Sequence, residues 1–231
     1  MKILYTGTDK RCKEFEEKFS TSGIDLLRFN FSEFNAINPK LFDAIFDLEF
    51  DSHQHRFETY ASLKNIPIIL HITQSSLLAQ SIKYPPNDLS LIYGMTAFPT
   101  FINRNIWEIT GLGNEALKYF DQLKKNLTIE AIIVKDRVGM ATSRVICMII
   151  NEAYYTLQEG TASRDDIDLA MKLGTNYPFG PFDWALKIGI KNVVETLEAV
   201  YNDTHDERYK VCPLLKTEYQ EQLALKTALL K

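Results

Sequence analysis

The chain has 231 residues, of which 26 are basic and 30 acidic, for a formal net charge of −4, and 45% are hydrophobic. This composition excludes a disordered, collagen-like or disulfide-stabilised miniature protein, and the small acidic excess argues against a nucleic-acid-binding surface. The sequence offers neither a membrane-spanning apolar run nor a secretory signal pattern. Cys12, Cys147 and Cys212 are far apart and match no metal spacing, so we expect reduced thiols in a cytoplasmic protein and no metal site.

The first part of the sequence alternates short apolar runs with helical patterns. We expect strands over residues 3–5, 24–29, 43–50, 66–72, 89–93, 106–110 and 129–134. Helices are expected between them, over residues 10–20, 55–63 and 114–125. This alternation predicts an α/β fold, with a Rossmann-like and mostly parallel sheet in a domain of residues 1–134.

Strand patterns vanish after Lys135, and residues 135–231 are expected to form an all-helical domain. The predicted helices cover residues 138–158, 165–172, 182–188 and 193–201, and Pro213 opens a last one. Gly160 and Gly174 are expected to end the first two. Leu223, Leu225 and residues 229–230 predict an apolar last helix that packs on a partner.

The helical part carries six short motifs in order. They are Val134-Lys135-Asp136, Gly139-Met140-Ala141-Thr142-Ser143-Arg144, Asn151-Glu152-Ala153, Glu159-Gly160, Asp166-Ile167-Asp168 and Gly180-Pro181-Phe182. Their order and spacing resemble the C-terminal domain of the 3-hydroxyacyl-CoA dehydrogenases. Upstream, residues 73–77 and 94–100 resemble this family's segments around its substrate-binding serine and its catalytic histidine.

The resemblance implies an NAD-dependent oxidoreductase of fatty acid metabolism that interconverts 3-hydroxyacyl-CoA and 3-ketoacyl-CoA, and a homodimer formed through the helical domain. In the family, a histidine takes the hydroxyl proton, a glutamate orients that histidine, and a serine and an asparagine hold the substrate oxygen. The matching positions here are Thr96 for the histidine, Glu108 for the glutamate, Ser75 for the serine and Ser143 for the asparagine.

Thr96 is the main departure from the family pattern. A threonine hydroxyl does not titrate near pH 7, and loss of a general base typically costs about 10²–10⁴ in rate. Two hypotheses stay open: a divergent dehydrogenase that uses Ser75, Glu108 and His71, or a non-catalytic acyl-CoA- or nucleotide-binding or assembly protein. Each residue also has a structural alternative: Ser75 as a helix cap, Glu108 as a strand-end acid, and His71 as a hydrogen-bonded strand residue.

The expected dinucleotide-binding loop is also degraded. The family's Gly-x-Gly-x-x-Gly corresponds to residues 7–12, where Gly7 remains but Asp9 and Cys12 replace the other two glycines. Asn30 stands where an acid usually binds the ribose, although its amide could still bond a hydroxyl. A second glycine pattern, over residues 111–116, is interpreted as a turn followed by a helix start.

Overall fold

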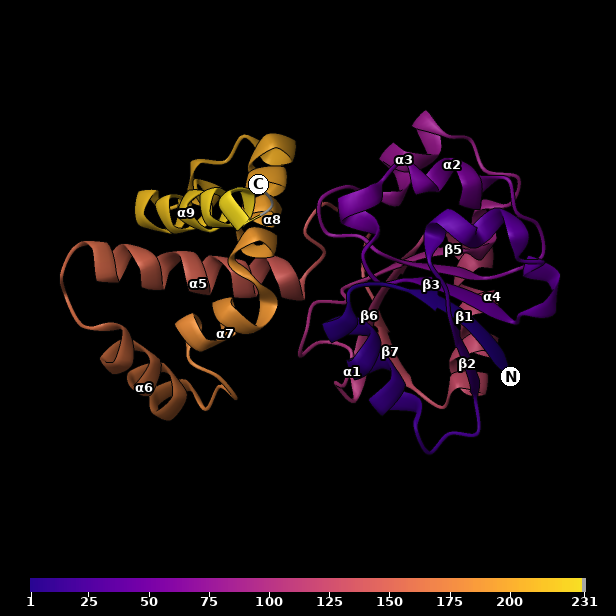
Figure 1. Cartoon of the computed structure of the whole chain (residues 1–231), viewed down its shortest axis with the longest axis horizontal. Coiled ribbons are helices and arrows are strands. Elements are labelled where there is room, and N and C mark those ends of the chain that lie inside the picture. The colour runs from indigo at the N-terminus through magenta and orange to yellow at the C-terminus, as the bar shows by residue number, and fades with distance from the viewer. Residues whose placement is uncertain (230–231) are drawn as a thin grey trace. The chain divides into compact units, whose positions relative to one another are not determined.

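The chain divides into two compact units, Met1–Ala141 and Thr142–Lys231 (Figure 1). The computed structural model describes residues 1–229, so the prediction for Leu230 lies outside the described residues. Residues 135–141, expected at the start of the helical domain, pack with the first unit.

The first unit is built on a seven-stranded sheet in the order β2-β1-β3-β4-β5-β6-β7. Its strands are β1 (Lys2–Thr6), β2 (Asp25–Arg28), β3 (Ala44–Asp47), β4 (Ile68–His71), β5 (Ile92–Met95), β6 (Ile106–Gly111) and β7 (Glu130–Ile133). All neighbouring strands are parallel except the β5–β6 pair, which is antiparallel. The prediction of a mostly parallel α/β sheet is confirmed.

Helices cover both faces of this sheet. Alternate side chains of each strand point to opposite faces, so each face presents apolar side chains that helices bury. Helices α1 (Asp9–Phe19) and α4 (Gly113–Leu127) pack on one face against Ile3 and Tyr5 of β1. Helices α2 (Arg56–Ala61) and α3 (Leu77–Lys83) contribute to the core on the other face, which contains Leu4. The remaining segments of the unit include short 3₁₀ turns over Phe31–Ala36, Pro39–Leu41, Phe50–His53 and Leu89–Leu91.

Two of these turns shorten expected strands. Strand β3 ends at Asp47 because the turn Phe50–His53 begins soon afterwards. Strand β5 begins only at Ile92, because the side chain of Asp88 accepts the N–H of Ser90 and starts the preceding turn.

The second unit contains α5 (Thr142–Gln158), α6 (Arg164–Thr175), α7 (Pro181–Ile188), α8 (Ile190–Thr204) and α9 (Pro213–Leu229). Helix α5 begins four residues later than predicted, because Gly139 and Met140 both have positive φ angles, 80° and 46°. Helix α6 continues through Gly174 and ends at Asn176, whose φ is 56°. The predicted stop at Gly174 is therefore wrong.

Two of the family-like motifs explain how α6 and α7 are joined. The carboxylate of Asp168 accepts the backbone N–H groups of Phe182 and Asp183, at 2.8 and 3.0 Å. These N–H groups lie in the first turn of α7 and lack intrahelical partners. Gly180 must stay small, because a Cβ there would lie 2.4 Å from the Cβ of Asp168.

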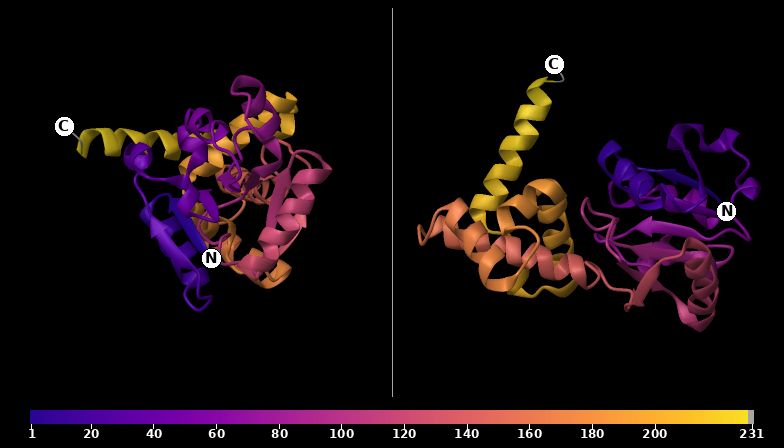
Figure 2. Two further views of the ribbon diagram at one scale, coloured as in Figure 1. Left: turned by 90° about the vertical axis from the view of Figure 1, so that its right-hand side faces the viewer. Right: turned by 90° about the horizontal axis from the view of Figure 1, so that it is seen from below.

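Helix α9 continues beyond the rest of its unit as a single rod (Figure 2). The side chains of residues 221–228 are exposed, including Leu223 and Leu225. The predicted apolar last helix is present over the described residues.

Candidate active site

Thr96, at the position of the family's histidine, lies just after β5 and is only 5% exposed. Its hydroxyl is 3.5 Å from the sulfur of Met140, in the turn that follows β7. Two backbone N–H groups of the same turn also donate hydrogen bonds. Gly139 donates its N–H to the carbonyl of Thr73 at 2.7 Å, and Ala141 donates its N–H to the carboxylate of Glu108.

Glu108 therefore acts within β6 as a hydrogen-bond acceptor for the protein backbone. Its side chain is buried, with a residue exposure of 7%. The structure brings Glu108 and Thr96 to the same turn, since each contacts a residue of Met140–Ala141. The predicted neighbourhood of these two positions is present, but without an imidazole between them.

Of the two neighbouring serines, Ser76 and not Ser75 caps helix α3. The hydroxyl of Ser76 caps α3 by accepting the N–H of Ala79 at 3.1 Å. Ser75 is half-buried, and its hydroxyl accepts a hydrogen bond from the side-chain amide of Gln80 at 3.0 Å. The hydroxyl of Ser75, in the segment after β4, also donates a long hydrogen bond to the carbonyl of Ser76, at 3.5 Å.

Asp51, which no sequence motif singled out, fixes the segment before Ser75. Its carboxylate accepts the N–H and the hydroxyl of Thr73, both at 2.7 Å, and the N–H of Gln74 at 3.1 Å. Burial raises the pKa of Asp51 to about 6, against the lowering effect of these hydrogen bonds. Asp51 thus holds the first part of the turn from β4 into α3, whereas the carboxylate of Asp136 accepts the N–H groups of Leu77 and Leu78 at its end, both at 2.9 Å.

His71, the candidate substitute base, is buried at the end of β4. Its Nδ1 accepts the N–H of Ala97 at 3.0 Å, and its Nε2 lies 3.5 Å from Oδ2 of Asp51. Burial, followed by the nearby guanidinium of Arg11, holds the pKa of His71 well below its usual range. This geometry fits a structural histidine and does not supply an accessible proton acceptor.

The loop between β1 and α1 keeps one of the three expected glycines. A Cβ on Gly7 would lie 2.9 Å from the Cβ of Leu48, so this position needs a glycine. Cys12 is buried and donates its thiol to the carbonyl of Gly7 at 3.3 Å. Asp9 extends its side chain into solvent, where Arg28 donates to its carboxylate at 2.6 Å.

Two other positions have local structural roles. The side-chain oxygen of Asn30 accepts the N–H of Ser32 at 3.3 Å and so begins a 3₁₀ turn. Gly111 ends β6 and Gly113, with φ of 87°, begins α4, which matches the interpretation of this glycine pattern as a turn and a helix start.

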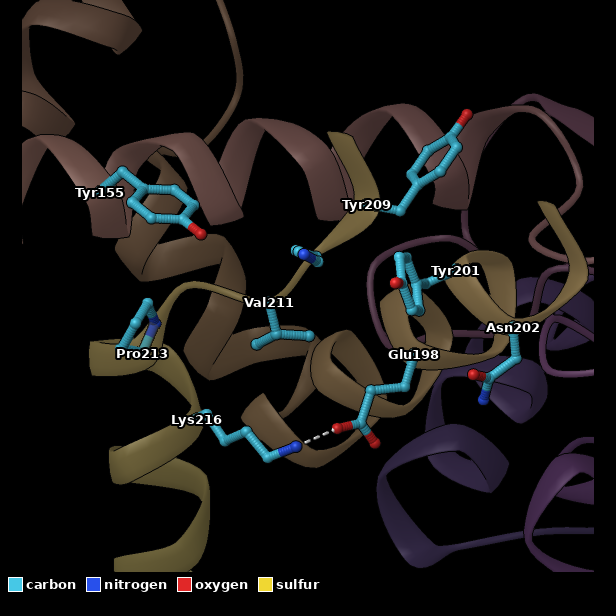
Figure 3. A pocket seen from close by; sticks show the side chains of 9 residues that line it. Tyr155, Glu198, Tyr201, Asn202, Tyr209, Val211, Pro213 and Lys216 are labelled. Atoms are coloured by element: carbon cyan, nitrogen blue, oxygen red, sulfur yellow. Dashed lines mark hydrogen bonds and ion pairs between the residues drawn. The ribbon is translucent and has the colours of Figure 1, made fainter. Parts of the chain in front are cut away.

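Ser143 belongs to the helical unit, where it is fully buried in the first turn of α5. The same unit contains a hollow of about 590 Å³ that the sequence did not indicate (Figure 3). Its lining comes from α5, α8, the segment that leads into α9 and the start of α9, and includes Tyr155, Tyr201 and Lys210. Lys216 pairs there with Glu198 at 2.6 Å.

Within residues 1–229, no three histidine, cysteine or acidic side chains are grouped so that they could hold a metal ion. None of the helices described combines the length and the apolar character that crossing a bilayer requires.

Comparison with known proteins finds relatives of the helical unit. Residues 139–228 match the family described as 3-hydroxyacyl-CoA dehydrogenase, C-terminal domain. The 3-hydroxyadipyl-CoA dehydrogenase of Escherichia coli (strain K12) is 40% identical over 102 residues, which cover 44% of this chain and 21% of that protein. The probable 3-hydroxybutyryl-CoA dehydrogenase of Bacillus subtilis (strain 168) is 32% identical over 151 residues, which cover 64% of this chain and 53% of that protein.

The fold has solved relatives over almost its full length. The (S)-3-hydroxybutyryl-CoA dehydrogenase of Ralstonia eutropha has a TM-score of 0.73 at 18% identity, and covers 96% of this chain and 94% of its own. The match to the curated relatives, in contrast, spans about a fifth and about half of their lengths. Residues 139–228 are therefore similar to the C-terminal domain of the 3-hydroxyacyl-CoA dehydrogenases, and the resemblance inferred from the sequence is confirmed.

Proposed function

We propose that this 3-hydroxyacyl-CoA dehydrogenase-like protein binds 3-hydroxyacyl-CoA or 3-ketoacyl-CoA thioesters and has weakened or lost the family's dehydrogenation. The observation that carries the proposal is the set of contacts around position 96, where the family has its general base. Thr96 cannot accept a proton near pH 7, and the carboxylate of Glu108 already accepts the N–H of Ala141.

The substrate side of the proposal rests on Ser75. Its hydroxyl remains at the carboxyl end of β4, where Asp51 fixes the preceding Thr73–Gln74 segment. A serine in such a place can donate a hydrogen bond to a carbonyl or hydroxyl oxygen.

The family implies an NAD cofactor, and the loop after β1 does not fit it well. A dinucleotide site uses its second glycine to let the backbone approach the pyrophosphate. Here Asp9 adds a side chain and a negative charge at that point, and Asn30 is engaged with Ser32. We therefore derive no step through NAD.

The second candidate is slow NAD-dependent interconversion of 3-hydroxyacyl-CoA and 3-ketoacyl-CoA. The relatives that carry this activity in their names favour it. A carboxyl with a pKa of about 6, Asp51, lies within the same unit and has the acidity of a general base. Its hydrogen bonds to Thr73 and Gln74 weigh against that role.

The proposal includes a homodimer formed by helical units, in a cell compartment without disulfide formation, consistent with buried free thiols. Leu169 and Leu173 of α6 and Leu186 of α7 are large apolar side chains that are more than half exposed. The same unit has an apolar groove of about 480 Å³ between α5 and α6. A second copy of the chain would cover this apolar surface.

The test is calorimetric titration of acetoacetyl-CoA into the protein, with Ser75→Ala and the matched control Ser81→Ala on α3. The proposal predicts saturable binding that Ser75→Ala weakens about tenfold, the loss of one hydrogen bond to a polar ligand group. Ser81→Ala should bind as the unmodified protein does. Absence of saturable binding, or equal affinity in both variants, would overturn the proposal.

A further inference from the structure

We infer that the crevice in which an open parallel sheet usually binds its ligand is filled here by the chain's own arginines, so that the first unit takes no nicotinamide dinucleotide. In the order β2-β1-β3-β4, the chain reverses its direction of strand addition between β1 and β3. Ligands of such sheets bind at this point, outside the carboxyl ends of the strands. The inference rests on the proposed function and specifies which of the family's ligands is missing.

Arg11 bridges the two loops that border this crevice. It belongs to the first turn of α1, which follows β1, and its Nη1 donates to the carbonyl of Leu48 just after β3, at 2.5 Å. Only 4% of the residue is exposed. The guanidinium also lies 5.9 Å from the centre of the Phe98 ring, which follows β5. A long side chain therefore crosses the crevice between β1 and β3.

The charged groups around Arg11 indicate that its guanidinium stabilises the fold. Burial lowers its pKa, and the nearby carboxylates of Asp51, Glu49 and Asp47 act in the opposite direction. Removing this buried guanidinium would leave the carbonyl of Leu48 without its donor and would take a positive charge away from Asp51. Asp47 and Glu49 would keep their ion pairs with Arg56, at 3.2 and 3.3 Å. A ligand-binding arginine would instead present open donors to the crevice.

Arg28 closes the other side of the same loop. It is the last residue of β2, and its Nη2 donates both to the carbonyl of Gly7 at 3.2 Å and to the carboxylate of Asp9 at 2.6 Å. The carboxylate of Asp9 thus lies at the N-terminus of α1, where an anionic pyrophosphate would have to bind. Arg28 thus reaches this loop from β2, while Arg11 links the start of α1 to the segment after β3.

An opposite role for these arginines makes distinct predictions. An arginine near the end of the second strand can receive the 2′-phosphate of NADP, and Arg28 has that place. If Arg28 and Arg11 bound phosphates, NADPH would bind more tightly than NADH, and removing Arg11 would weaken binding without lowering stability. If they fill the crevice, neither dinucleotide binds and removing Arg11 lowers stability.

The experiment titrates NADH and NADPH separately into the protein, with fluorescence as the readout, and compares the melting temperatures of Arg11→Met and Lys13→Met. Lys13 lies on the exposed face of the same helix, with a side-chain exposure of 77%. We expect no saturable binding up to about 1 mM of either dinucleotide. Arg11→Met should lower the melting temperature by about 5 °C or more, whereas Lys13→Met should change it by less than about 2 °C.

A variant outside the core keeps the test decisive if Arg11→Met does not fold. Asp9→Gly restores the bare backbone and removes the ion pair, and it should still bind neither dinucleotide, because Arg11 remains in the crevice. Binding of NADH or NADPH by the unmodified protein or by Asp9→Gly would overturn the inference, as would an unchanged melting temperature in Arg11→Met. Acetoacetyl-CoA binding, measured on the same samples, tests the proposed function separately.

Discussion

The carboxylate of Glu108 accepts the backbone N–H of Ala141, the residue that immediately precedes helix α5. In a chain with threonine at position 96, this acid has no imidazole to orient. It instead anchors the turn over Gly139–Ala141, whose first two residues have positive φ angles. The acid that orients the proton-accepting histidine in the family thus stabilises a backbone turn here.

This relationship predicts unequal effects of two substitutions at Glu108. Glu108→Ala leaves the N–H of Ala141 without its acceptor and should lower the free energy of unfolding by about 1–3 kcal/mol. Glu108→Gln keeps an acceptor oxygen and should cost less than half as much. Urea denaturation measures both. Glu130→Ala, an exposed acid of the neighbouring strand β7, is the control and should have little effect. Equal losses in Ala and Gln variants would contradict the anchoring role.

Gly94 and Gly174 differ in the space around them, so substitution by alanine should have opposite effects on stability. A Cβ on Gly94 would lie 2.5 Å from Cγ2 of Ile72 and 2.8 Å from Cγ2 of Thr110, inside the sheet. Gly94→Ala should therefore destabilise the protein by about 1–3 kcal/mol through overpacking. Gly174→Ala meets nothing within 4 Å in α6 and should stabilise by about 0.4–1 kcal/mol. Thermal denaturation showing the same sign for both would contradict this packing.

Asp51 and His71 predict opposing contributions to stability as the pH falls. The pKa of His71 is lowered by burial, so below pH 6.5 the unfolded state takes up a proton that the folded state refuses, and stability falls. The pKa of Asp51 is raised to about 6, so between pH 6 and about 4 the folded state holds a proton that the unfolded state releases, and stability rises.

When one of these groups is substituted, the pH dependence of stability should show the contribution of the other group alone. Asp51→Asn should lose stability more steeply than the unmodified protein between pH 6.5 and 4.5, because only the contribution of His71 remains. His71→Gln should show a shallower loss or a gain over the same range. Urea denaturation at several pH values gives the slopes, and parallel profiles for the three proteins would exclude this assignment.

The proposed dimer predicts a change in mass on substitution of one exposed leucine. Leu173, 77% exposed on α6, would be buried by a second copy, so Leu173→Asp should shift the protein to monomer. Leu41→Asp, at a similarly exposed leucine of the first unit, is the control and should leave the mass unchanged. Light scattering after size-exclusion chromatography measures both. A monomeric unmodified protein would rule out the dimer.

The alternation of apolar runs and helical patterns predicted the sheet, because each strand of a parallel sheet is buried and separated from the next by a helix. It did not predict that β5 and β6 are antiparallel, since hydrophobic periodicity carries no information on strand direction. The later start of α5 depends on the positive φ of Met140, which its residue type does not suggest.

Only those residues of the candidate site that lie within a family-like motif, or at a fixed spacing from one, could be predicted from the sequence. Ser75, Thr96, Glu108 and Ser143 follow from spacing relative to the family. Asp51 was missed because its role arises from contact with Thr73, 22 residues away, and no local pattern marks it. Arg11 lies inside the degraded glycine motif, but its crossing to Leu48 is visible only in three dimensions.

The central expectation is that dehydrogenation is weak or absent, because no general base stands at position 96 and the crevice beside β1 takes no nicotinamide dinucleotide. Its most direct test is acetoacetyl-CoA-dependent loss of NADH absorbance, measured beside the Bacillus subtilis relative under the same conditions. We expect a rate at least about 10²-fold lower than that of the relative, or none. A rate equal to that of the relative would contradict the account.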